Sequence, residues 1–456
     1  MPSLEQWIEL QWPRAAGFML ASVSPLGVVK ARPGFGQVIR PVRGAIVASP
    51  VPASYDPDPD YFFHWFRDSA LVIDALRLLR GDAQFGPDAA GHFGDFVRFS
   101  LSLRSLDGAA LAGAPGWRER VAPDFRQYLR EDLELAAVRG DAVYADTRVN
   151  PDGSLDISRW SRPQHDGPPL RALALLRWLD GVALAPDVVA DAVALLRLDL
   201  AFALQHWREP GFDIWEEERG EHYYTLSLSA AALQRGAAWL EARGEAQRAR
   251  ECRRASEAML ARLDGFWLPE AGHYRSRVLE GGARSAKELD ISVILAAIHA
   301  GLAGPAHSVR DPRMHATLGR LEDLFDASYP INRAVERGRG TQRGPAMGRY
   351  EGDVYYSGGA YYFSTLGAAE FCYRAAGAGG PGTQQWLARG DAYLQTVRRH
   401  TPPSGEMSEQ FDQATGAQTS ARHLAWSYAA FLSCVAARRS TAASSPSRQF
   451  PPDSSQ

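Results

Sequence analysis

The sequence has few cysteines, no long apolar run and no cluster of basic residues, and each absence excludes a class of protein. The 456 residues include three cysteines, Cys252, Cys372 and Cys434, whose odd number and wide spacing fit neither a disulfide framework nor a zinc pattern. We expect three reduced, buried thiols, as in a reducing compartment. No segment approaches the roughly 18–20 apolar residues of a membrane span.

Charge and the N-terminal segment exclude further classes. The formal net charge is −3, and no basic run or polybasic cluster predicts nucleic acid or an anionic membrane surface as a partner. The N-terminal stretch MPSLEQWIELQWPRAAGF has early acidic residues and no apolar core of the signal-peptide type. We therefore expect a soluble, cytoplasmic protein. The sequence gives no indication of its oligomeric state.

Strand signals are also scarce, and the dominant pattern is helical. Apolar residues recur at i, i+3 and i+4, as on one face of a helix, and the best strand signal is a short β-hairpin within residues 26–47. The pattern predicts about twelve helices, over residues 68–80, 89–104, 123–138, 169–180, 186–206, 222–241, 245–263, 287–303, 312–326, 359–376, 384–399 and 419–437.

The predicted helices alternate in character. Some carry Ala- and Leu-rich stripes with little charge, whereas others, such as 245–263, are strongly two-faced. Inner helices surrounded by outer helices would give this alternation. No Pro-, Gly- or Ser-rich linker divides the chain, so we expect one all-α catalytic domain over residues 1–438, with a short N-terminal extension. The polar, Pro- and Ser-rich residues 439–456 predict a disordered tail.

Aromatic residues make up 10% of the chain, and many stand beside charged residues in predicted loops. In PDYFFHWFRDSA (59–70), Trp65 precedes Arg67 and Asp68, and in SRWSRPQHDGPPLR (158–171), Trp160 precedes Arg162 and Asp166. A flat ring beside a donor and an acceptor suits a pyranose, which has an apolar face and many hydroxyls. An ordinary helix start explains each segment alone. Residues 212–220 and 406–428 combine aromatic and charged residues in the same way, and four such loops favour a sugar site.

Three consecutive carboxylates, Glu216, Glu217 and Glu218, follow a tryptophan in FDIWEEERG (212–220). Glycosidic bonds are cleaved by two carboxyl groups, one of which protonates the leaving oxygen while the other activates water or attacks carbon. The acid needs a raised pKa, which apolar surroundings or neighbouring negative charge would provide. A solvated acidic turn is the alternative for this segment. Glu409, in MSEQFD (407–412), is a candidate for the second carboxyl.

Five motifs in order resemble glycoside hydrolase family fifteen, the glucoamylases and their relatives, over roughly residues 40–437. They are WFRD (65–68), SRPQHDGP (161–168), DIWEE (213–217), GRYEGDVYY (348–356) and MSEQFD (407–412). The resemblance implies an (α/α)₆ barrel of six inner and six outer helices, with a pocket at one end. It also implies inversion at the anomeric carbon, without a metal or organic cofactor.

Carried over residue by residue, the resemblance implies specific roles. Glu216 corresponds to the general acid and Glu409 to the general base, with their carboxyl groups roughly 6.5–9.5 Å apart, as an inverting mechanism requires. Glu218 is expected to face solvent. The substrate-binding residues implied are Tyr61, Trp65, Arg67, Asp68, Trp160, Glu217, Arg349 and Trp426.

The sequence departs from the family pattern at Phe63, His165, His423 and the segment Ser357-Gly358-Gly359-Ala360. We expect most of these positions in or near loops that form subsites beyond the first glucose. No Ser/Thr-rich linker and starch-binding module follow, so we expect a short oligosaccharide substrate with α-1,4 or α-1,6 linkages.

Two alternatives stay open at this point. One is a trehalase within the same family, and the other is a non-catalytic sugar-binding or regulatory (α/α)₆ domain. Pure binding does not require a paired acid and base, so the presence of Glu216 and Glu409 favours an enzyme. A terpene cyclase would need acidic metal-binding motifs such as DDxxD, and none occurs.

Overall fold

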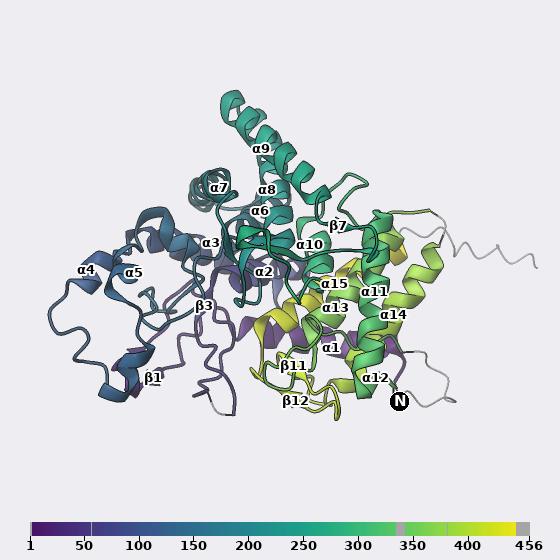
Figure 1. The fold of residues 1–456 in the computed structure, drawn as a ribbon, viewed down its shortest axis with the longest axis horizontal. Coiled ribbons are helices and arrows are strands. Elements are labelled where there is room, and N and C mark those ends of the chain that lie inside the picture. The colour runs from purple at the N-terminus through teal and green to yellow at the C-terminus, as the bar shows by residue number, and fades with distance from the viewer. Residues whose placement is uncertain (1, 56, 334–342, 381, 444–456) are drawn as a thin grey trace, which may run out of the picture.

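Six helices of the described chain contact one another in a closed ring, and Figure 1 shows them near the centre of the molecule. The computed structural model describes residues 2–55, 57–333, 343–380 and 382–443. Within these residues each inner helix contacts the next, and the last contacts the first. The six are α2 (Phe66–Leu76), α6 (Gly167–Gly181), α8 (Tyr223–Glu241), α10 (Ser292–Ala300), α13 (Tyr362–Gly377) and α15 (Ala425–Ala443).

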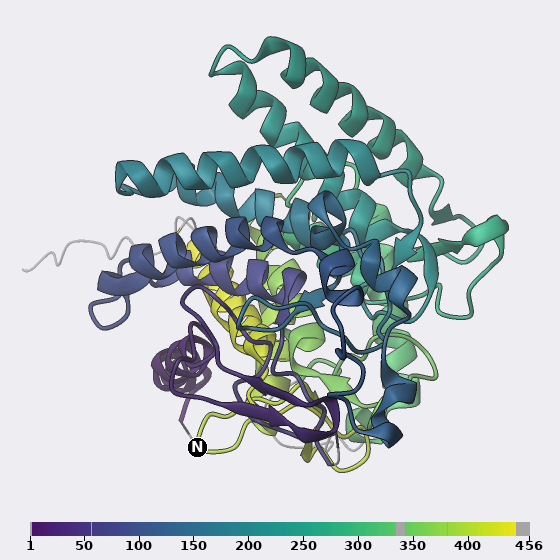
Figure 2. The same ribbon diagram turned by 90° about the vertical axis from the view of Figure 1, so that its left-hand side faces the viewer.

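Six further helices of the described chain pack outside this ring, so the all-α class and the expected (α/α)₆ barrel are confirmed. In Figure 2 the long α7 (teal) runs beside α3 (blue), with which it is in contact. The outer helices are α1 (Leu4–Leu20), α3 (Gly86–Ser102), α7 (Pro186–His206), α9 (Ala246–Asp264), α11 (Pro312–Ser328) and α14 (Thr383–His400).

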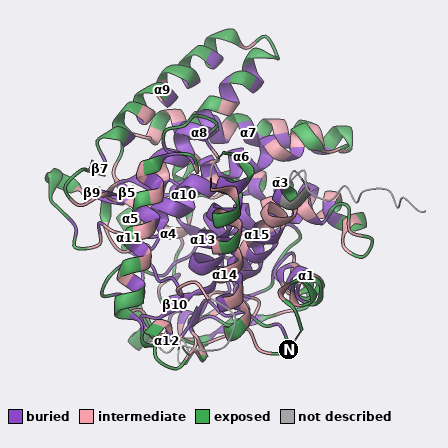
Figure 3. Ribbon diagram, turned by 90° about the vertical axis from the view of Figure 1, so that its right-hand side faces the viewer, coloured by how far each residue is buried: buried purple, intermediate pink, exposed green. Residues whose placement is uncertain are grey.

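The composition of each ring explains its place. Inner helices such as α8 and α13 bury residues on all sides, which suits their small and apolar sequences. On α9, by contrast, the buried residues are Ala249, Cys252, Ser256, Met259 and Leu263, spaced three or four apart on one face. Figure 3 shows the result: the central helices are buried, and α9 and α11 expose their outer faces.

Two helix predictions were wrong, although the two rings together hold twelve helices of the described chain. Helix α1 was not predicted, although a capping box of Ser3 and Gln6 starts it. Pro13 and the polar Gln11 on its buried face obscure the pattern. The predicted helix 123–138 is instead a 3₁₀ segment (Pro123–Tyr128) followed by the short α5 (Asp132–Ala136). Residues 123–128 bury nothing, so no packing supports a longer helix there.

The predicted tail also begins later than residue 439. Helix α15 runs to Ala443, Arg439 forms an ion pair with Glu9 of α1, and Thr441 donates a hydrogen bond to the Tyr373 carbonyl of α13. These contacts extend the helix past the point where the composition becomes polar. Residues 444–456 lie outside the described residues, so the expectation of disorder there stays a prediction.

The strands are short and connect loops around the barrel. The predicted hairpin is confirmed as β1 (Lys30–Arg32) paired antiparallel with β2 (Gln37–Ile39). The other pairings of the described chain are antiparallel too. They join β3 (His64–Trp65) to β4 (Arg148–Val149); β5 (Gly211–Phe212) to β6 (Arg219–His222) and β6 to β9 (Arg277–Leu279); β7 (Trp267–Leu268) to β8 (His273–Tyr274); and β10 (Ala360–Tyr361) to β11 (Gln410–Phe411) and β11 to β12 (Gln418–Thr419).

Strands β3, β6 and β10 lead directly into the inner helices α2, α8 and α13. The loops that carry the sequence motifs therefore meet at one end of the barrel, at the N-termini of inner helices. The remaining short helices are α4 (Gly108–Ala112), beside α5, and α12 (Pro330–Arg333). The segment with α4 and α5 forms a lobe at the left of Figure 1 and shares a second, smaller apolar core with residues such as Phe35 and Phe99.

Two expectations about the chain as a whole can be compared with the structure. All three cysteines lie in described residues, and each is buried and unpaired, as expected. Among the helices that the structure describes, none is both long enough and apolar enough to cross a lipid bilayer.

Candidate active site

A cavity of about 460 Å³ opens at the end of the barrel where the motif loops meet. Its walls come from the starts of α2, α13 and α15 and from the segments before α6, α8 and β10. All ten residues predicted for the site line this one cavity. They are Tyr61, Trp65, Arg67, Asp68, Trp160, Glu216, Glu217, Arg349, Glu409 and Trp426.

A tight turn between β5 and β6 presents Glu216 to the cavity. Glu216 has φ +65°, an uncommon conformation for a residue other than glycine. The turn is closed by the Glu216 N–H, which donates to the Asp213 carbonyl at 2.9 Å. Asp213 Oδ1 also accepts from the N–H groups of Glu217 and Glu218 at 2.7 and 3.2 Å. Asp213 therefore fixes the backbone of all three glutamates.

The Glu216 carboxyl group is held by three donors. Trp65 Nε1 donates to Oε1 at 2.9 Å, and Arg67 Nη2 donates to the same atom at 3.2 Å. Trp160 Nε1 donates to Oε2, and Ser161 Oγ donates to the Glu216 backbone carbonyl. The side chain is 10% exposed, so its orientation is fixed by contacts from two different loops.

The three consecutive glutamates have separate cationic partners. Glu217 accepts from Arg349 at 2.9 Å, from Lys287 at 2.6 Å and from the Tyr350 hydroxyl. The sequence predicted that Glu218 faces solvent, but in the structure this side chain is paired instead. It accepts from Arg277 at 3.0 Å and from Ser285 at 2.7 Å. Because both neighbours of Glu216 are paired, the negative charges closest to it in the sequence are compensated.

Arg277, on β9, joins the turn to the barrel. Its side chain is 1% exposed and forms ion pairs with Asp213 at 2.5 Å, with Glu218 at 3.0 Å and with Asp290. Asp290 also accepts from Trp215 Nε1 at 2.8 Å. A buried cation with three carboxylates in contact has its desolvation cost offset by those partners. The sequence analysis did not identify Arg277, which lies 64 residues from Asp213.

The opposite carboxyl group, Glu409, has hydroxyl partners. Ser420 Oγ donates to Oε2, and the Tyr61 hydroxyl donates to Oε1 at 3.3 Å. Burial raises the pKa of Glu409 to about 7, although the hydrogen bond from Ser420 acts in the opposite direction. The Tyr61 hydroxyl is also 2.8 Å from the hydroxyl of Tyr355. Glu409 thus has a pKa near neutrality.

Arg67 and Asp68 lie in the first turn of α2, in an ion pair of 3.1 Å between Arg67 Nη2 and Asp68 Oδ2. Arg67 Nη1 lies 3.7 Å from Asp166, whose pKa burial raises to about 6. Asp68 Oδ2 and the Arg67 atoms Nε and Nη1 are buried without a hydrogen bond. Buried polar atoms that lack a hydrogen bond are unusual in proteins.

Aromatic rings form much of the remaining wall. The rings of Trp426 and Phe363 stack at 4.1 Å with an interplanar angle of 8°, and Trp215 stacks on Trp426 at 6.2 Å. Tyr61 and Trp65 are in tilted contact at 5.2 Å. The cavity therefore combines flat apolar faces with charged groups.

Eight further lining residues were not predicted. They are Ala48, Arg159, Ser161, Ile214, Trp215, Tyr355, Phe363 and Leu424. Trp215 and Tyr355 stand inside motifs that the sequence analysis used, so their position was the available signal. Phe363 lies within a helical pattern that indicates only core packing. Tyr355 lines the cavity, whereas its neighbour Tyr356 does not.

The departures from the family pattern are not among the residues that line the cavity, and the expectation that most lie in or near loops of further subsites stays a prediction. Phe63 is buried behind Trp65, with the Arg32 guanidinium 3.8 Å from its ring centre. His423 lies 2.8 Å from the Tyr428 hydroxyl. In the 357–360 segment, Ser357 Oγ donates to Gln410 at 2.9 Å. His165 packs in its own cavity beside His206. These positions support the walls rather than form them.

Comparison with known proteins agrees with the fold and the cavity. The family model described as glycosyl hydrolases family 15 matches residues 32–85, 148–386 and 382–436. A probable glucoamylase of Schizosaccharomyces pombe is 27% identical over 474 residues, which cover 95% of this chain and 91% of that protein. An intracellular, sporulation-specific glucoamylase of Saccharomyces cerevisiae is 25% identical, with 94% and 83% covered.

Solved structures show the same architecture. The glucoamylase from Saccharomycopsis fibuligera superposes with a TM-score of 0.76 at 21% identity, covering 97% of this chain and 96% of that one. The family model and the glucoamylase relatives show that the chain is a glycoside hydrolase. The match over three quarters of its residues shows that the chain belongs to glycosyl hydrolases family 15.

Proposed function

We propose that this enzyme is an inverting, exo-acting glycoside hydrolase that releases β-D-glucose from the non-reducing ends of short α-glucosides. The observation that carries the proposal is the presence of Glu216 and Glu409 in the wall of one cavity, from segments 193 positions apart in the chain (409 − 216). A paired acid and base in one pocket is the minimum that glycoside hydrolysis requires.

In this proposal Glu216 is the general acid. It protonates the glycosidic oxygen as the bond to the anomeric carbon breaks, and the departing sugar takes that proton. Trp65, Arg67 and Trp160 hold its carboxyl group through the contacts described above. This orientation supports transfer along one direction, because a misplaced donor loses much of its catalytic effect.

Glu409 is the general base. It removes a proton from a water molecule that attacks the anomeric carbon on the opposite face of the sugar, so the configuration at that carbon inverts. Tyr61 donates to Glu409 Oε1 and contacts Tyr355, and the two hydroxyls support the placement of that water. The pKa of about 7 keeps a substantial fraction of Glu409 ionised at neutral pH.

Substrate binding is assigned to the other predicted residues of the cavity. Trp65, Trp160 and Trp426 offer ring faces for the apolar side of a pyranose, and Tyr61 completes this group. Arg67 and Asp68, which line the cavity, hold hydroxyls of the terminal glucose. Glu217 and Arg349, already paired at 2.9 Å, bind further hydroxyls.

The size of the cavity supports a short substrate. About 460 Å³ is in the lower part of the range for ligand pockets, roughly 300–1,000 Å³, which suits a di- or trisaccharide end. The linkage is α-1,4, α-1,6 or both. The relatives named as glucoamylases support a glucan or its fragments as the substrate class.

The measurement that tests the proposal is proton NMR of the first sugar released from maltose and isomaltose, with trehalose alongside. We expect β-glucose to appear before mutarotation mixes the anomers. Early α-glucose would contradict inversion. Hydrolysis of trehalose alone would favour a trehalase, and binding without turnover of any of the three would favour a non-catalytic sugar-binding domain.

We also propose that the barrel acts as one catalytic domain in the cytoplasm. The three buried, unpaired cysteines support a reducing compartment, and a relative is named as intracellular. Measuring the enzyme in cytosolic and secreted fractions of cells that express it tests the location. Its presence in the secreted fraction alone would contradict it.

A further inference from the structure

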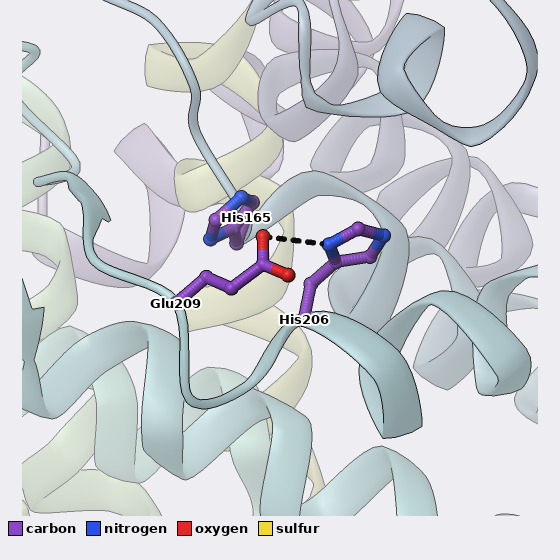
Figure 4. Close-up of side chains that lie close together, drawn as sticks. All are labelled: His165, His206 and Glu209. Atoms are coloured by element: carbon purple, nitrogen blue, oxygen red, sulfur yellow. Dashed lines mark hydrogen bonds and ion pairs between the residues drawn. The ribbon is translucent and has the colours of Figure 1, made fainter.

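Two histidines and a glutamate come together outside the catalytic cavity, as Figure 4 shows. One potential ligand atom from each of His165, His206 and Glu209 lies within 4.8 Å of the others. His206 is the last residue of α7, and Glu209 follows in a turn that its N–H closes by donating to the His206 carbonyl at 2.9 Å. His165 comes from the segment before α6, so the cluster joins two parts of the chain.

The chemistry of the cluster is that of a transition-metal site. The rings of His165 and His206 lie 5.7 Å apart with an interplanar angle of 28°. Imidazole nitrogens and a carboxylate are common ligands of such ions. Glu209 Oε2 lies 2.9 Å from His206 Nδ1, and in Figure 4 its carboxylate extends toward both rings.

The three side chains also share a small cavity of their own. Its volume is about 20 Å³, room for roughly one water-sized sphere. His222 lines the same cavity, and its Nδ1 is buried without a hydrogen-bond partner, as is Nε2 of His206. Two histidines that line the cavity therefore have a ring nitrogen without a hydrogen bond, and the cavity has the size of a single ion or water.

We propose that His165, His206 and Glu209 bind a divalent transition-metal ion, for which Zn²⁺ is the best match. Two imidazoles and a carboxylate are ligands that zinc accepts, whereas Ca²⁺ and Mg²⁺ prefer oxygen ligands alone. Donors bound at about 2.0–2.1 Å around a tetrahedral ion lie roughly 3.3 Å apart, so the cluster must contract by at most about 1.5 Å. The Glu209 side chain is 54% exposed and can make that movement.

The location of the ion gives it a structural role near the catalytic turn. Next to His165, Gln164 Nε2 donates to the Asp213 carbonyl at 2.7 Å, and the Phe212 N–H donates to the Pro163 carbonyl at 2.8 Å. The ion would thus tie the end of α7 to the segment that supports the Glu216 turn. This differs from the sequence expectation of no metal, and it assigns no metal to the reaction itself.

The experiment is calorimetric titration of ZnCl₂ into the untagged, full-length enzyme after chelator treatment. We expect one ion to bind per chain. In Glu209→Gln and in His206→Gln the affinity for Zn²⁺ should be weaker by about tenfold or more. His92→Gln, on α3 and outside the cluster, is the matched control and is expected to bind as the wild type does. The melting temperature should rise with ZnCl₂ and not with MgCl₂ or CaCl₂.

Two outcomes would overturn the site. One is the absence of saturable Zn²⁺ binding, and the other is equal affinity in all three variants, which would put the ion elsewhere. Glu209→Gln changes a half-exposed side chain and keeps the proposal testable if His206→Gln fails to fold. Neither outcome bears on the roles of Glu216 and Glu409, which line a different cavity.

Discussion

The two carboxyl groups of the catalytic cavity have opposite surroundings. Glu216 is held by indole and guanidinium N–H groups, and behind it Arg277 joins Asp213, Glu218 and Asp290 in a buried ionic network. The hydrogen bonds to the Glu409 carboxyl group come from hydroxyls, those of Tyr61 and Ser420. On one side of the cavity paired charges surround Glu216. On the other side the Glu409 carboxyl group is buried, and its hydrogen bonds come from neutral hydroxyls.

This difference places separate physical constraints on two side chains of the same type. Paired charges fix a geometry, because each ion pair has directional partners and the loss of one leaves others unpaired. Burial among hydroxyls instead sets a protonation state, since it disfavours the charged form and raises the pKa. The proposed acid is therefore held in one orientation, and burial raises the pKa of the proposed base.

The largest expected effect is on turnover, when either carboxyl group is neutralised. Glu216→Gln and Glu409→Gln should each lower kcat on the better of maltose and isomaltose by about 10²- to 10⁴-fold, because each removes one proton-transfer group. Glu221→Gln, on β6 near the same turn but outside the cavity lining, is the control and should keep most of the activity. Near-normal turnover in either catalytic variant would remove that residue from the mechanism.

The next effect concerns the ionic network behind Glu216. Arg277→Met should lower the free energy of unfolding by about 3–5 kcal/mol, because it leaves three carboxylates without their buried cation. Arg262→Met removes a partly exposed ion pair with Glu221 and should cost about 0–1 kcal/mol. Urea unfolding of both variants measures the difference. Equal losses would mean that the network adds nothing beyond a surface pair.

On the Glu409 side, the expected effect is on stability as a function of pH. The folded-state pKa of about 7 lies above the ordinary value of 4.5, so the folded state holds this proton more tightly than the unfolded chain. The contribution of this tighter proton binding to the free energy of unfolding is about 3 kcal/mol. It is fully present below pH 4.5 and is lost as pH rises to about 7.

Glu409→Gln carries no such group, and it isolates this contribution from those of other titrating residues. Relative to the wild type, the variant should become more stable by about 3 kcal/mol between pH 4 and pH 8, as measured by urea unfolding at both values. A difference that does not change with pH would show that Glu409 has an ordinary pKa, and the contrast between the two carboxyl groups would fail.

The smallest effect is on the pH dependence of catalysis. If Glu409 must be ionised, kcat/KM should fall as pH drops through about 7. Ser420→Ala removes a hydrogen bond that favours the ionised form of Glu409. The acidic limb of the pH profile, where kcat/KM falls, should therefore move to higher pH. Ser427→Ala, whose hydroxyl donates to the Ser408 carbonyl instead, should leave the limb in place. A limb that moves equally in both variants would argue against the specific contact.

Apolar periodicity predicted most of the helices, and the resemblance to glycoside hydrolase family fifteen implied their arrangement as a barrel. The periodicity missed α1, where Pro13 and Gln11 interrupt that pattern, and it assigned a helix to 123–138, where no buried face supports one. The strand pairings around the cavity were mostly invisible, because strands of two to four residues carry too little pattern.

The sequence predicted residues that line the cavity, but it did not predict the residues that hold them in place. The resemblance to glycoside hydrolase family fifteen supplied ten of the eighteen residues that line the cavity. Arg277 and Ser420 could not be found this way, because their roles arise from contacts made in three dimensions with residues elsewhere in the chain. The same reason explains Glu218, which seemed free in the sequence and is paired in the fold.

The most direct test of the account uses a substrate whose leaving group needs no acid. α-D-Glucosyl fluoride loses fluoride with little protonation, so Glu216→Gln should hydrolyse it at a rate close to that of the wild type while it fails on maltose and isomaltose. Glu409→Gln should fail on all three, because it still lacks the group that activates water. If Glu216→Gln loses the fluoride as well, or Glu409→Gln retains it, the assignment of acid and base is wrong.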